Sequence, residues 1–274
     1  MKKEWIQESE LALKAISESL EIITKSSNST DFIKNKESYR DIVTDVDFLV
    51  EKRIKSVLDI TGYNILGEET ADRIPDDIFS CGPTWIVDPI DGTVNFASSI
   101  PFYSTSVGLM EKEQFILGAV VVPEFKEIFF SIGSDKAYLN GRILKSGNAM
   151  MKNSLIAAGF SGKAYAPEKR QIEYELFGRI NDHSRGCLRL GSAAINICYV
   201  AAGRLQAAYG IANKIWDVAG AIAIARCAGC DIYFEHISNT YLVNYVVGFH
   251  GVTDEIAEIV QSKQLANLHL ISSE

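Results

Sequence analysis

Three short stretches carry the residues of this chain that are best suited to chemistry. They are Gly67-Glu68-Glu69, Asp88-Pro89-Ile90-Asp91-Gly92-Thr93 and Trp216-Asp217. Each lies where an apolar run ends, so we expect each at the end of a strand or the start of a helix, where open α/β layers bind ligands. Oxygen donors without neighbouring His or Cys favour magnesium or manganese over zinc. The pattern predicts a divalent-cation site assembled from distant segments.

The second stretch could also hold a phosphate group. Pro89 fixes one backbone angle, and Gly92 lets a ligand approach the backbone closely. If a helical turn begins at Thr93, the amides of Gly92 and Thr93 point outward, as anion-binding amides do. Taken alone, each of the three stretches also fits a capped turn, a solvated loop or a helix N-cap. Their joint occurrence favours the site.

Clustered carboxylates repel one another, and two or three bound cations would remove that repulsion. Paired cations can also activate a water molecule and stabilise the attacking and leaving oxygens of a displacement. No Cys or Asp arrangement indicates a phosphoenzyme. We therefore expect direct in-line attack of water on phosphorus.

Hydrophobic periodicity predicts the elements that position these residues. Helices are predicted at 4–24, 46–59, 168–181, 192–202, 217–228 and 253–264. Strands are predicted at 63–66, 85–87, 102–111, 115–122, 126–132, 154–158, 187–190, 205–209 and 242–249, with a tight turn at Asn140-Gly141. The order of these elements predicts an α+β or α/β fold in which sheets lie between helices. We expect one domain, 1–274, with an α+β metal-binding half at 1–150 and an α/β half at 151–274.

Composition narrows the class of protein. The chain has 274 residues with a formal net charge of −8, and its basic residues are scattered, which disfavours a nucleic-acid surface. No apolar run is long enough for a membrane span, and the charged start does not resemble a signal peptide, so we expect a cytoplasmic protein. Five cysteines fit a reducing compartment. Cys227 and Cys230 could form half a zinc site or a redox pair, but two small buried residues at a helix end fit better.

The chain resembles the inositol monophosphatase family over nearly its whole length. The resemblance is carried by residues 41–47 (DIVTDVD), 67–69 (GEE), 85–96 (WIVDPIDGTVNF) and 216–220 (WDVAG). It implies a layered αβαβα sandwich of the sugar-phosphatase type. It also implies a magnesium-dependent, lithium-sensitive phosphatase that hydrolyses small phosphate monoesters with a metal-activated water and forms a homodimer.

The resemblance further implies a role for each matched residue. Metal ligands would be Glu68, Asp88, the Ile90 carbonyl, Asp91 and Asp217, with a third, weaker cation near Glu68 and Asp47. Thr93, aided by Asp47 or Glu68, would help deprotonate the attacking water. Substrate would contact Asp91, Gly92, Thr93, Lys36, Gly191, Ser192, Ala193 and Asp217. Two of these have equally good structural interpretations, since Ser192 fits an N-cap and Lys36 fits a solvated loop.

The chain departs from the family pattern at one important position. Typical members have a sugar-binding glutamate seven residues before the tryptophan-linked aspartate, where this chain has Gly210. Inositol specificity is therefore open, and Lys214 suggests a second phosphate. Alternative substrates are NADP, 3′-phosphoadenosine 5′-phosphate and fructose 1,6-bisphosphate. A metabolite-binding regulator and a calcium module on Asp45-x-Asp47 are weaker alternatives, because the carboxylate set is intact and the rest of a calcium loop is missing.

Overall fold

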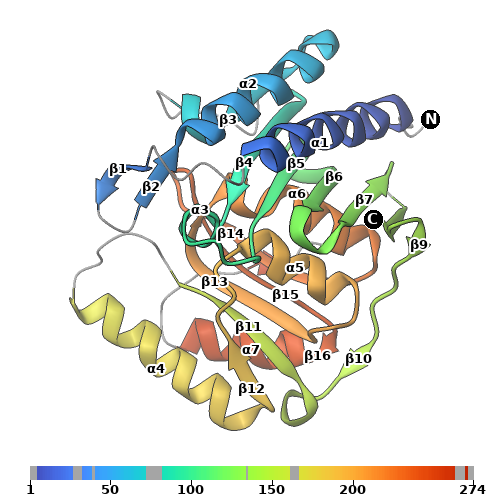
Figure 1. The fold of residues 1–274 in the computed structure, drawn as a ribbon. Helices are drawn as coiled ribbons and strands as arrows, with labels where there is room; N and C mark the ends of the chain where they lie inside the picture. Colours follow the sequence, from blue (N-terminus) through green and yellow to red (C-terminus); the bar gives the residue numbers. More distant parts are fainter. Residues whose placement is uncertain are drawn as a thin grey trace.

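The chain folds into five alternating layers of helices and sheets, as the sequence predicts (Figure 1). The computed structural model describes residues 5–26, 33–38, 41–71, 82–133, 135–160, 167–262 and 269–270, without the side chains of 33–38, 41–43 and 167–169. From top to bottom in Figure 1, the layers are α1 with α2, a seven-stranded sheet, α5 with α6, a six-stranded sheet, and α4 with α7.

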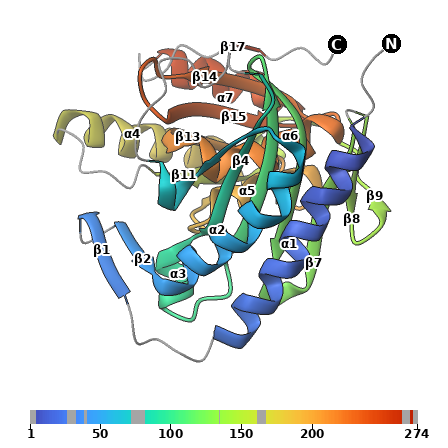
Figure 2. The same cartoon turned by 90° about the horizontal axis from the view of Figure 1, so that it is seen from above.

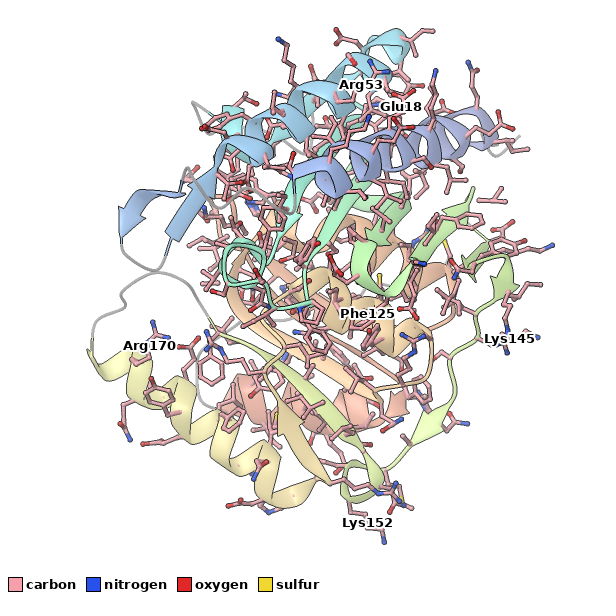
Figure 3. All side chains as sticks on the ribbon, viewed as in Figure 1. Glu18, Arg53, Phe125, Lys145, Lys152 and Arg170 are labelled. Atoms are coloured by element: carbon pink, nitrogen blue, oxygen red, sulfur yellow. The ribbon has the colours of Figure 1, made fainter. Side chains whose placement is uncertain are left out.

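The outer layer consists of α1 (Ile6–Ser26) and α2 (Asp45–Leu58), which lie side by side on the seven-stranded sheet (Figure 2). Both helices bury a stripe of apolar residues at helical spacing, and Ile16 and Ile54 are fully buried. Arg53 of α2 forms an ion pair with Glu18 of α1 at 2.9 Å (Figure 3). Two predicted helices, 4–24 and 46–59, are confirmed here with ends shifted by one or two residues.

The seven-stranded sheet has the strand order β3-β4-β5-β6-β7-β8-β9. Its strands are β3 (Asn64–Gly67), β4 (Thr84–Asp91), β5 (Ser104–Glu111), β6 (Gln114–Val122), β7 (Glu127–Ile132), β8 (Lys136–Leu139) and β9 (Arg142–Ile143). The β3–β4 pair is parallel and the other pairs are antiparallel. Asn140 and Gly141 have φ of 47° and 81°, which confirms the predicted hairpin turn.

The middle layer consists of α5 (Ala193–Ala201) and α6 (Ile215–Cys227), which lie between the two sheets. Helix α6 is apolar on nearly every side because both of its faces are covered. Its Gly220 lies so close to the seven-stranded sheet that a Cβ on Gly118 would be 1.9 Å from the Gly220 carbonyl oxygen. This close contact fixes the height of α6, and therefore of Asp217 one turn earlier, above the sheet.

The six-stranded sheet has the strand order β12-β11-β13-β15-β14-β17. Its strands are β11 (Leu155–Gly159), β12 (Gly186–Leu188), β13 (Ala207–Lys214), β14 (Asp231–His236), β15 (Leu242–Gly248) and β17 (His269–Leu270). The sheet is parallel around β11 and antiparallel elsewhere. Helices α4 (Pro167–His183) and α7 (Val252–Ser262) cover its outer face.

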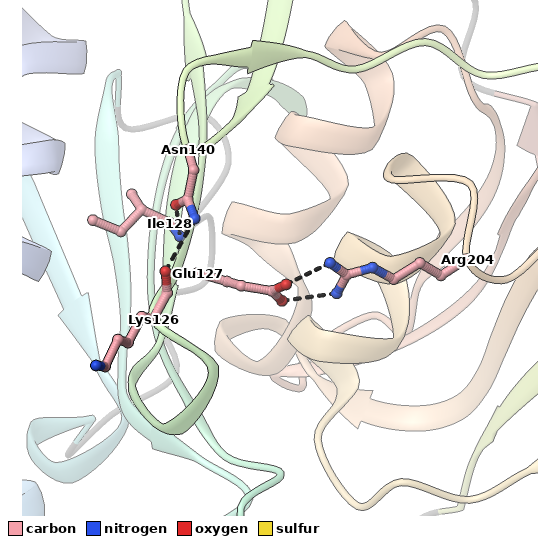
Figure 4. Close-up of polar contacts among 5 residues, drawn as sticks. All are labelled: Lys126, Glu127, Ile128, Asn140 and Arg204. Carbon is pink, nitrogen blue, oxygen red and sulfur yellow. Dashed lines mark hydrogen bonds and ion pairs between the residues drawn. The ribbon is translucent and has the colours of Figure 1, made fainter.

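Apolar packing and a surface ion pair join the two halves. One core cluster contains Ile86 and Phe115 from the seven-stranded sheet, Ile222 of α6, and Val243 and Val247 from the six-stranded sheet. Arg204, after α5, forms a two-pronged ion pair with Glu127 of β7, and Asn140 bonds the backbone of both neighbours of Glu127 (Figure 4). The sheets are therefore held together both in the core and at the surface.

Several elements differ from the sequence prediction. Strand β4 extends past the predicted end at 87, and β13 starts two residues later than the predicted 205 and extends past the predicted end at 209. Strand β14 was missed, as were β1 (Ile33–Ser38), β2 (Asp41–Thr44), β10 (Asn148–Ala149), β16 (His250–Gly251) and β17. Most of these are short strands whose polar sequences carry little periodic signal.

The structure also bears on three smaller predictions. Helix α2 begins at Asp45, so Asp45-x-Asp47 lies in a helix and is not part of a calcium loop. Cys227 and Cys230 are free thiols at the end of α6, and Cys230 is buried, as expected for a structural helix end. Among the helices in the described residues, none has an apolar stretch that could cross a bilayer.

Candidate active site

Asp88 and Asp91 lie on an irregular part of β4. Between the pairs Asp88–Ser106 and Asp91–Ser104, β4 advances three residues while β5 advances two, so β4 contains a β-bulge. In a regular strand, residues three apart point to opposite faces. The bulge re-aims the chain, and both aspartates line the same cavity. Pro89, which has no amide proton to lose from the ladder, lies inside this bulge.

Glu68 lies in a single turn, residues Glu68–Thr70, that follows β3. The buried carboxylate of Glu51, on α2, holds this turn in place. It accepts hydrogen bonds from the Glu69 amide at 2.7 Å and from the Thr70 hydroxyl at 2.6 Å. Glu51 was not predicted from the sequence, although its position four residues after Asp47 places both acids on one face of α2.

Asp217 lies in the first turn of α6, and its Oδ2 accepts a hydrogen bond from the Lys214 amide at 3.1 Å. A carboxylate is favourable there because the helix N-terminus carries partial positive charge. Glu68, Asp88 and Asp217 each place one oxygen within 4.8 Å of the others. Three segments that are far apart in sequence thus converge at one point, as the acidic stretches indicated.

The oxygen cluster fits a divalent cation. One oxygen of Asp88, Oδ1, is buried without a hydrogen-bond partner in the part of the chain that the structure describes. Burial raises the pKa of Asp88 well above its ordinary value, and the charges of Glu68, Asp91, Asp217 and Asp47 raise it further. Burial likewise raises the pKa of Asp217, with Asp91 and Glu68 adding to the effect. A bound cation would satisfy the unpartnered oxygen and offset this repulsion.

Asp91 is held by the start of α5. It accepts hydrogen bonds from the Ser192 hydroxyl and from the amides of Ala194 at 2.7 Å and Ala193 at 3.3 Å. Burial raises the pKa of Asp91 to about 6, although these hydrogen bonds oppose the shift. Ser192 also caps α5 by accepting from the Ile195 amide at 3.1 Å, so its predicted N-cap role is confirmed. The amides near Ala193 were expected to face substrate, and those of Ala193 and Ala194 donate to Asp91.

A carboxamide joins the two loops that border the cavity. Asn95 Nδ2 donates to the Phe102 carbonyl at 2.7 Å and to the Leu190 carbonyl at 2.8 Å. Gly92 has φ of 92°, and a Cβ there would lie 2.9 Å from the Phe102 carbonyl oxygen, so a side chain is excluded. The predicted helical turn is present as α3 (Thr93–Ala97), which begins directly after Gly92.

The other predicted residues lie as follows. The Thr93 hydroxyl donates to the Ile90 carbonyl at 3.0 Å, and both residues line the cavity. Asp47 is buried near Asp88, and its Oδ2 accepts from the Thr44 amide at 2.8 Å. Gly191 lines the cavity just before Ser192. Lys36 lies on β1, and its side chain is outside the described residues.

The cavity beside these carboxylates has a volume of about 730 Å³, which lies within the usual range for a small-molecule site. The ends of β4 and β11, the starts of α3 and α5, and the β13–α6 junction border it. One wall carries the acidic cluster. The rest of the lining is formed by neutral and basic residues, of which Lys214 lies 3.8 Å from Glu68.

Comparison with known sequences and structures finds relatives over most of the chain. The sequence profile of the inositol monophosphatase family matches residues 4–264. Inositol monophosphatase 3 of Solanum lycopersicum is 32% identical over 226 residues, covering 80% of this chain and 83% of the relative. The fructose-1,6-bisphosphatase/inositol-1-monophosphatase of Thermotoga maritima is 29% identical over 240 residues, covering 84% and 86%. Among solved structures, an IMPase of Thermotoga maritima superimposes with a TM-score of 0.77 at 26% identity, covering 93% of this chain and 97% of that one.

The layered fold and the oxygen-rich site thus define the class of this protein, a phosphatase that acts on phosphate monoesters. The chain belongs to the inositol monophosphatase family, whose profile spans nearly all of it.

Proposed function

We propose that this protein hydrolyses small phosphate monoesters, such as inositol or sugar phosphates, with magnesium as its cofactor and manganese as a substitute. The convergence of Glu68, Asp88 and Asp217 within 4.8 Å carries the proposal. All the donors are oxygens, which suits hard cations of this type. The family similarity supports the phosphatase class, and the structure of the cavity supports a small substrate.

The carboxylates divide between two cation positions in this proposal. Glu68, Asp88 and the Ile90 carbonyl would hold one cation, and Asp88, Asp91 and Asp217 would hold a second. Asp47 and Glu68 would take part in a third, weaker position. When bound, the cations would lower the pKa of a water molecule and neutralise charge that develops on the phosphate.

The surrounding residues would orient the phosphate. The Gly92 and Thr93 amides, at the start of α3, would donate to its oxygens and stabilise negative charge there. The Thr93 hydroxyl would turn from the Ile90 carbonyl toward the attacking water, and Asp47 or Glu68 would accept the proton. Ser192 and the α5 amides would keep Asp91 in its orientation. Water would attack phosphorus in line as the ester P–O bond breaks, and the leaving alkoxide would take a proton from solvent, without a phosphoenzyme.

A phosphate-release assay tests the proposal directly. The panel contains inositol 1-phosphate, glucose 1-phosphate, fructose 1,6-bisphosphate, NADP and 3′-phosphoadenosine 5′-phosphate, each with magnesium, with a chelator, and with added lithium. We expect turnover that requires magnesium and is inhibited by lithium. Turnover that persists in the chelator would contradict the cofactor assignment. Binding without turnover of any ester would favour the regulator alternative.

One specific observation favours a second candidate substrate, a sugar bisphosphate. A relative from Thermotoga maritima carries both fructose-1,6-bisphosphatase and inositol-1-monophosphatase in its name. The same panel distinguishes these activities.

The proposal also includes the oligomeric state of the protein and its location in the cell. We expect a homodimer, by analogy with the family, and a cytoplasmic location, because the five cysteines fit a reducing compartment. Sedimentation of the purified protein tests the first expectation, and cell fractionation tests the second.

A further inference from the structure

The lining of the cavity contains both acidic and basic side chains. Its acidic lining residues in the described chain are Glu68, Asp88, Asp91 and Asp217, all of which belong to the proposed cation site. Its basic lining residues are Arg170, Arg189 and Lys214. Once cations occupy the carboxylates, no acidic side chain in the described lining is left to repel a second negative group on the substrate.

The absence of an acid at position 210 is imposed by packing. A Cβ on Gly210 would lie 2.2 Å from Asn213 Oδ1 and 2.5 Å from Tyr245 Cε1, so no side chain fits. Strand β13 bulges here, since it advances three residues from Gly210 to Asn213 while β15 advances two from Tyr245 to Val243, and Ala212 has φ of 48°. The bulge places the neutral Asn213 on the cavity wall, with its Oδ1 lacking a partner among the described residues.

Lys214 follows the bulge and brings a positive charge beside the cation site. Its ammonium lies 3.8 Å from Glu68 Oε1 and 5.2 Å from the centre of the Trp216 ring. A cation bound to Glu68 would neutralise part of the negative charge of that carboxylate. The carboxylate would then attract the Lys214 ammonium less strongly. The ammonium of Lys214, which lines the cavity, would then attract an anionic group of the substrate more strongly.

The two arginines of the wall differ in their partners. Arg170 of α4 (Figure 3) is paired with Glu173 at 2.8 Å, so its charge is balanced locally. The exposed Arg189 lies over the Phe160 ring at 5.6 Å, and no described carboxylate pairs with it. A guanidinium held on an aromatic face and lacking a carboxylate partner is suited to binding a phosphate or carboxylate.

We propose that the preferred substrate is a phosphate ester that carries a second anionic group, bound by Lys214 and Arg189 while the scissile phosphate lies at Gly92 and Thr93. This inference rests on the proposed phosphatase function and narrows its substrate class. A sugar bisphosphate and a nucleotide both provide the required second anion. The experiment below distinguishes them.

Matched pairs of esters test the second-anion site. Fructose 1,6-bisphosphate is compared with fructose 1-phosphate, and NADP with adenosine 2′-monophosphate, at saturating magnesium. We expect kcat/KM to be about tenfold higher for the member with the extra anion in at least one pair, equivalent to ~1.4 kcal/mol. The pair that shows the preference identifies a sugar or a nucleotide as the carrier.

Variants assign the preference to its residues. Arg189→Gln and Lys214→Gln should each reduce that preference by raising KM for the doubly anionic ester, with a smaller change for the singly anionic one. Arg189→Lys should retain part of the preference. The matched control is Arg185→Gln, because Arg185 is exposed and does not line the cavity.

Failure of the second-anion site and failure of the phosphatase function would give different results. Equal kcat/KM within both pairs, or Gln variants that weaken both members of a pair equally, would overturn the second-anion site and leave the phosphatase function intact. No hydrolysis of any ester would overturn the phosphatase function, and the second-anion site with it.

Discussion

Strands β4 and β13 each contain one extra residue relative to a regular neighbour, and both bulges border the same cavity. The β4 bulge brings two carboxylates, Asp88 and Asp91, to one side of the strand. The β13 bulge brings a carboxamide, Asn213, and leaves Gly210 without room for any side chain. A β-bulge therefore shapes both sides of the cavity. We call the side with Asp88 and Asp91 the acidic wall, and the side with Asn213 and Lys214 the β13 wall.

The difference corresponds to the proposed division between catalysis and substrate selection. The acidic wall is tightly held by neighbouring groups, namely the α5 amides around Asp91 and the buried Glu51 behind Glu68. Each wall has a buried oxygen that lacks a partner among the described residues, Asp88 Oδ1 on the acidic wall and Asn213 Oδ1 on the β13 wall. Such atoms are costly to bury and gain a partner when a ligand binds. We infer that the first wall performs the reaction and the second recognises the substrate.

Among the substitutions proposed for the acidic wall, Asp91→Asn should reduce kcat/KM the most. The asparagine retains an acceptor for the α5 amides, so the fold should persist, but it lacks the charge needed to hold a cation. We expect kcat/KM to fall by more than about 100-fold at saturating magnesium. Circular dichroism checks the fold, and near-normal turnover would show that Asp91 is not a ligand.

Glu51→Gln tests a residue that holds the Glu68 turn in place but is not itself a proposed cation ligand. The glutamine amide would face the Glu69 amide or the Thr70 hydroxyl, both of which now donate to Glu51. We expect magnesium affinity, measured by calorimetry, to weaken by about 10- to 100-fold, with kcat largely recovered at high magnesium.

The exposed Glu21 on α1 provides the control for Glu51, as Glu21→Gln. Equal magnesium affinity in both variants and the wild type would show that Glu51 does not position the Glu68 turn.

Gly210→Ala tests the packing of the β13 wall. The added methyl group would overlap Asn213 and Tyr245, so we expect a loss of about 1–3 kcal/mol in the free energy of unfolding, measured with urea. Gly210→Glu, which introduces the residue typical of the family, should lose at least as much and gain no activity on inositol 1-phosphate. A stable Gly210→Glu variant with raised inositol 1-phosphate activity would refute the packing argument.

The smallest expected effect is the change in the free energy of unfolding with pH. Burial raises the pKa of Asp88 and Asp217 well above the ordinary value, and that of Asp91 to about 6. A carboxyl group whose pKa rises on folding stabilises the protein at low pH, and this contribution is lost as pH rises through the folded-state pKa. The metal-free protein should therefore lose on the order of 1 kcal/mol between about pH 4 and pH 7 as Asp91 ionises, and lose further stability as Asp88 and Asp217 ionise.

Urea denaturation with a chelator and with magnesium measures this slope. Magnesium should reduce it, because bound cations favour the ionised carboxylates. A chelated protein whose stability rises over that interval, with Asp91→Asn behaving identically, would contradict the assigned shifts.

The sequence predicted the residues of the acidic wall better than those of the β13 wall. Glu68 directly follows β3, Asp91 ends β4 and Asp217 lies in the first turn of α6, and the local pattern reveals such positions. Most long helices and strands were also predicted, because their apolar periodicity is strong. The five-layer fold followed from their order together with the family resemblance.

What the sequence could not predict depends on contacts between distant segments. The periodicity of β4 and β13 does not reveal their bulges, which exist only relative to β5 and β15. Glu51 resembles any other helical glutamate until α2 packs beside the Glu68 turn. The steric reason for Gly210 lies in Tyr245, which is 35 residues away along the chain.

Crystals soaked in manganese test the central claim most directly, because anomalous scattering locates this cation without reference to activity. We predict at least one strong peak in contact with oxygens of Glu68, Asp88 and Asp217, at about 2.0–2.3 Å. The peak should disappear in Asp88→Asn crystals. A peak elsewhere with this cluster empty, or no peak at saturating manganese, would contradict the shared-cation site.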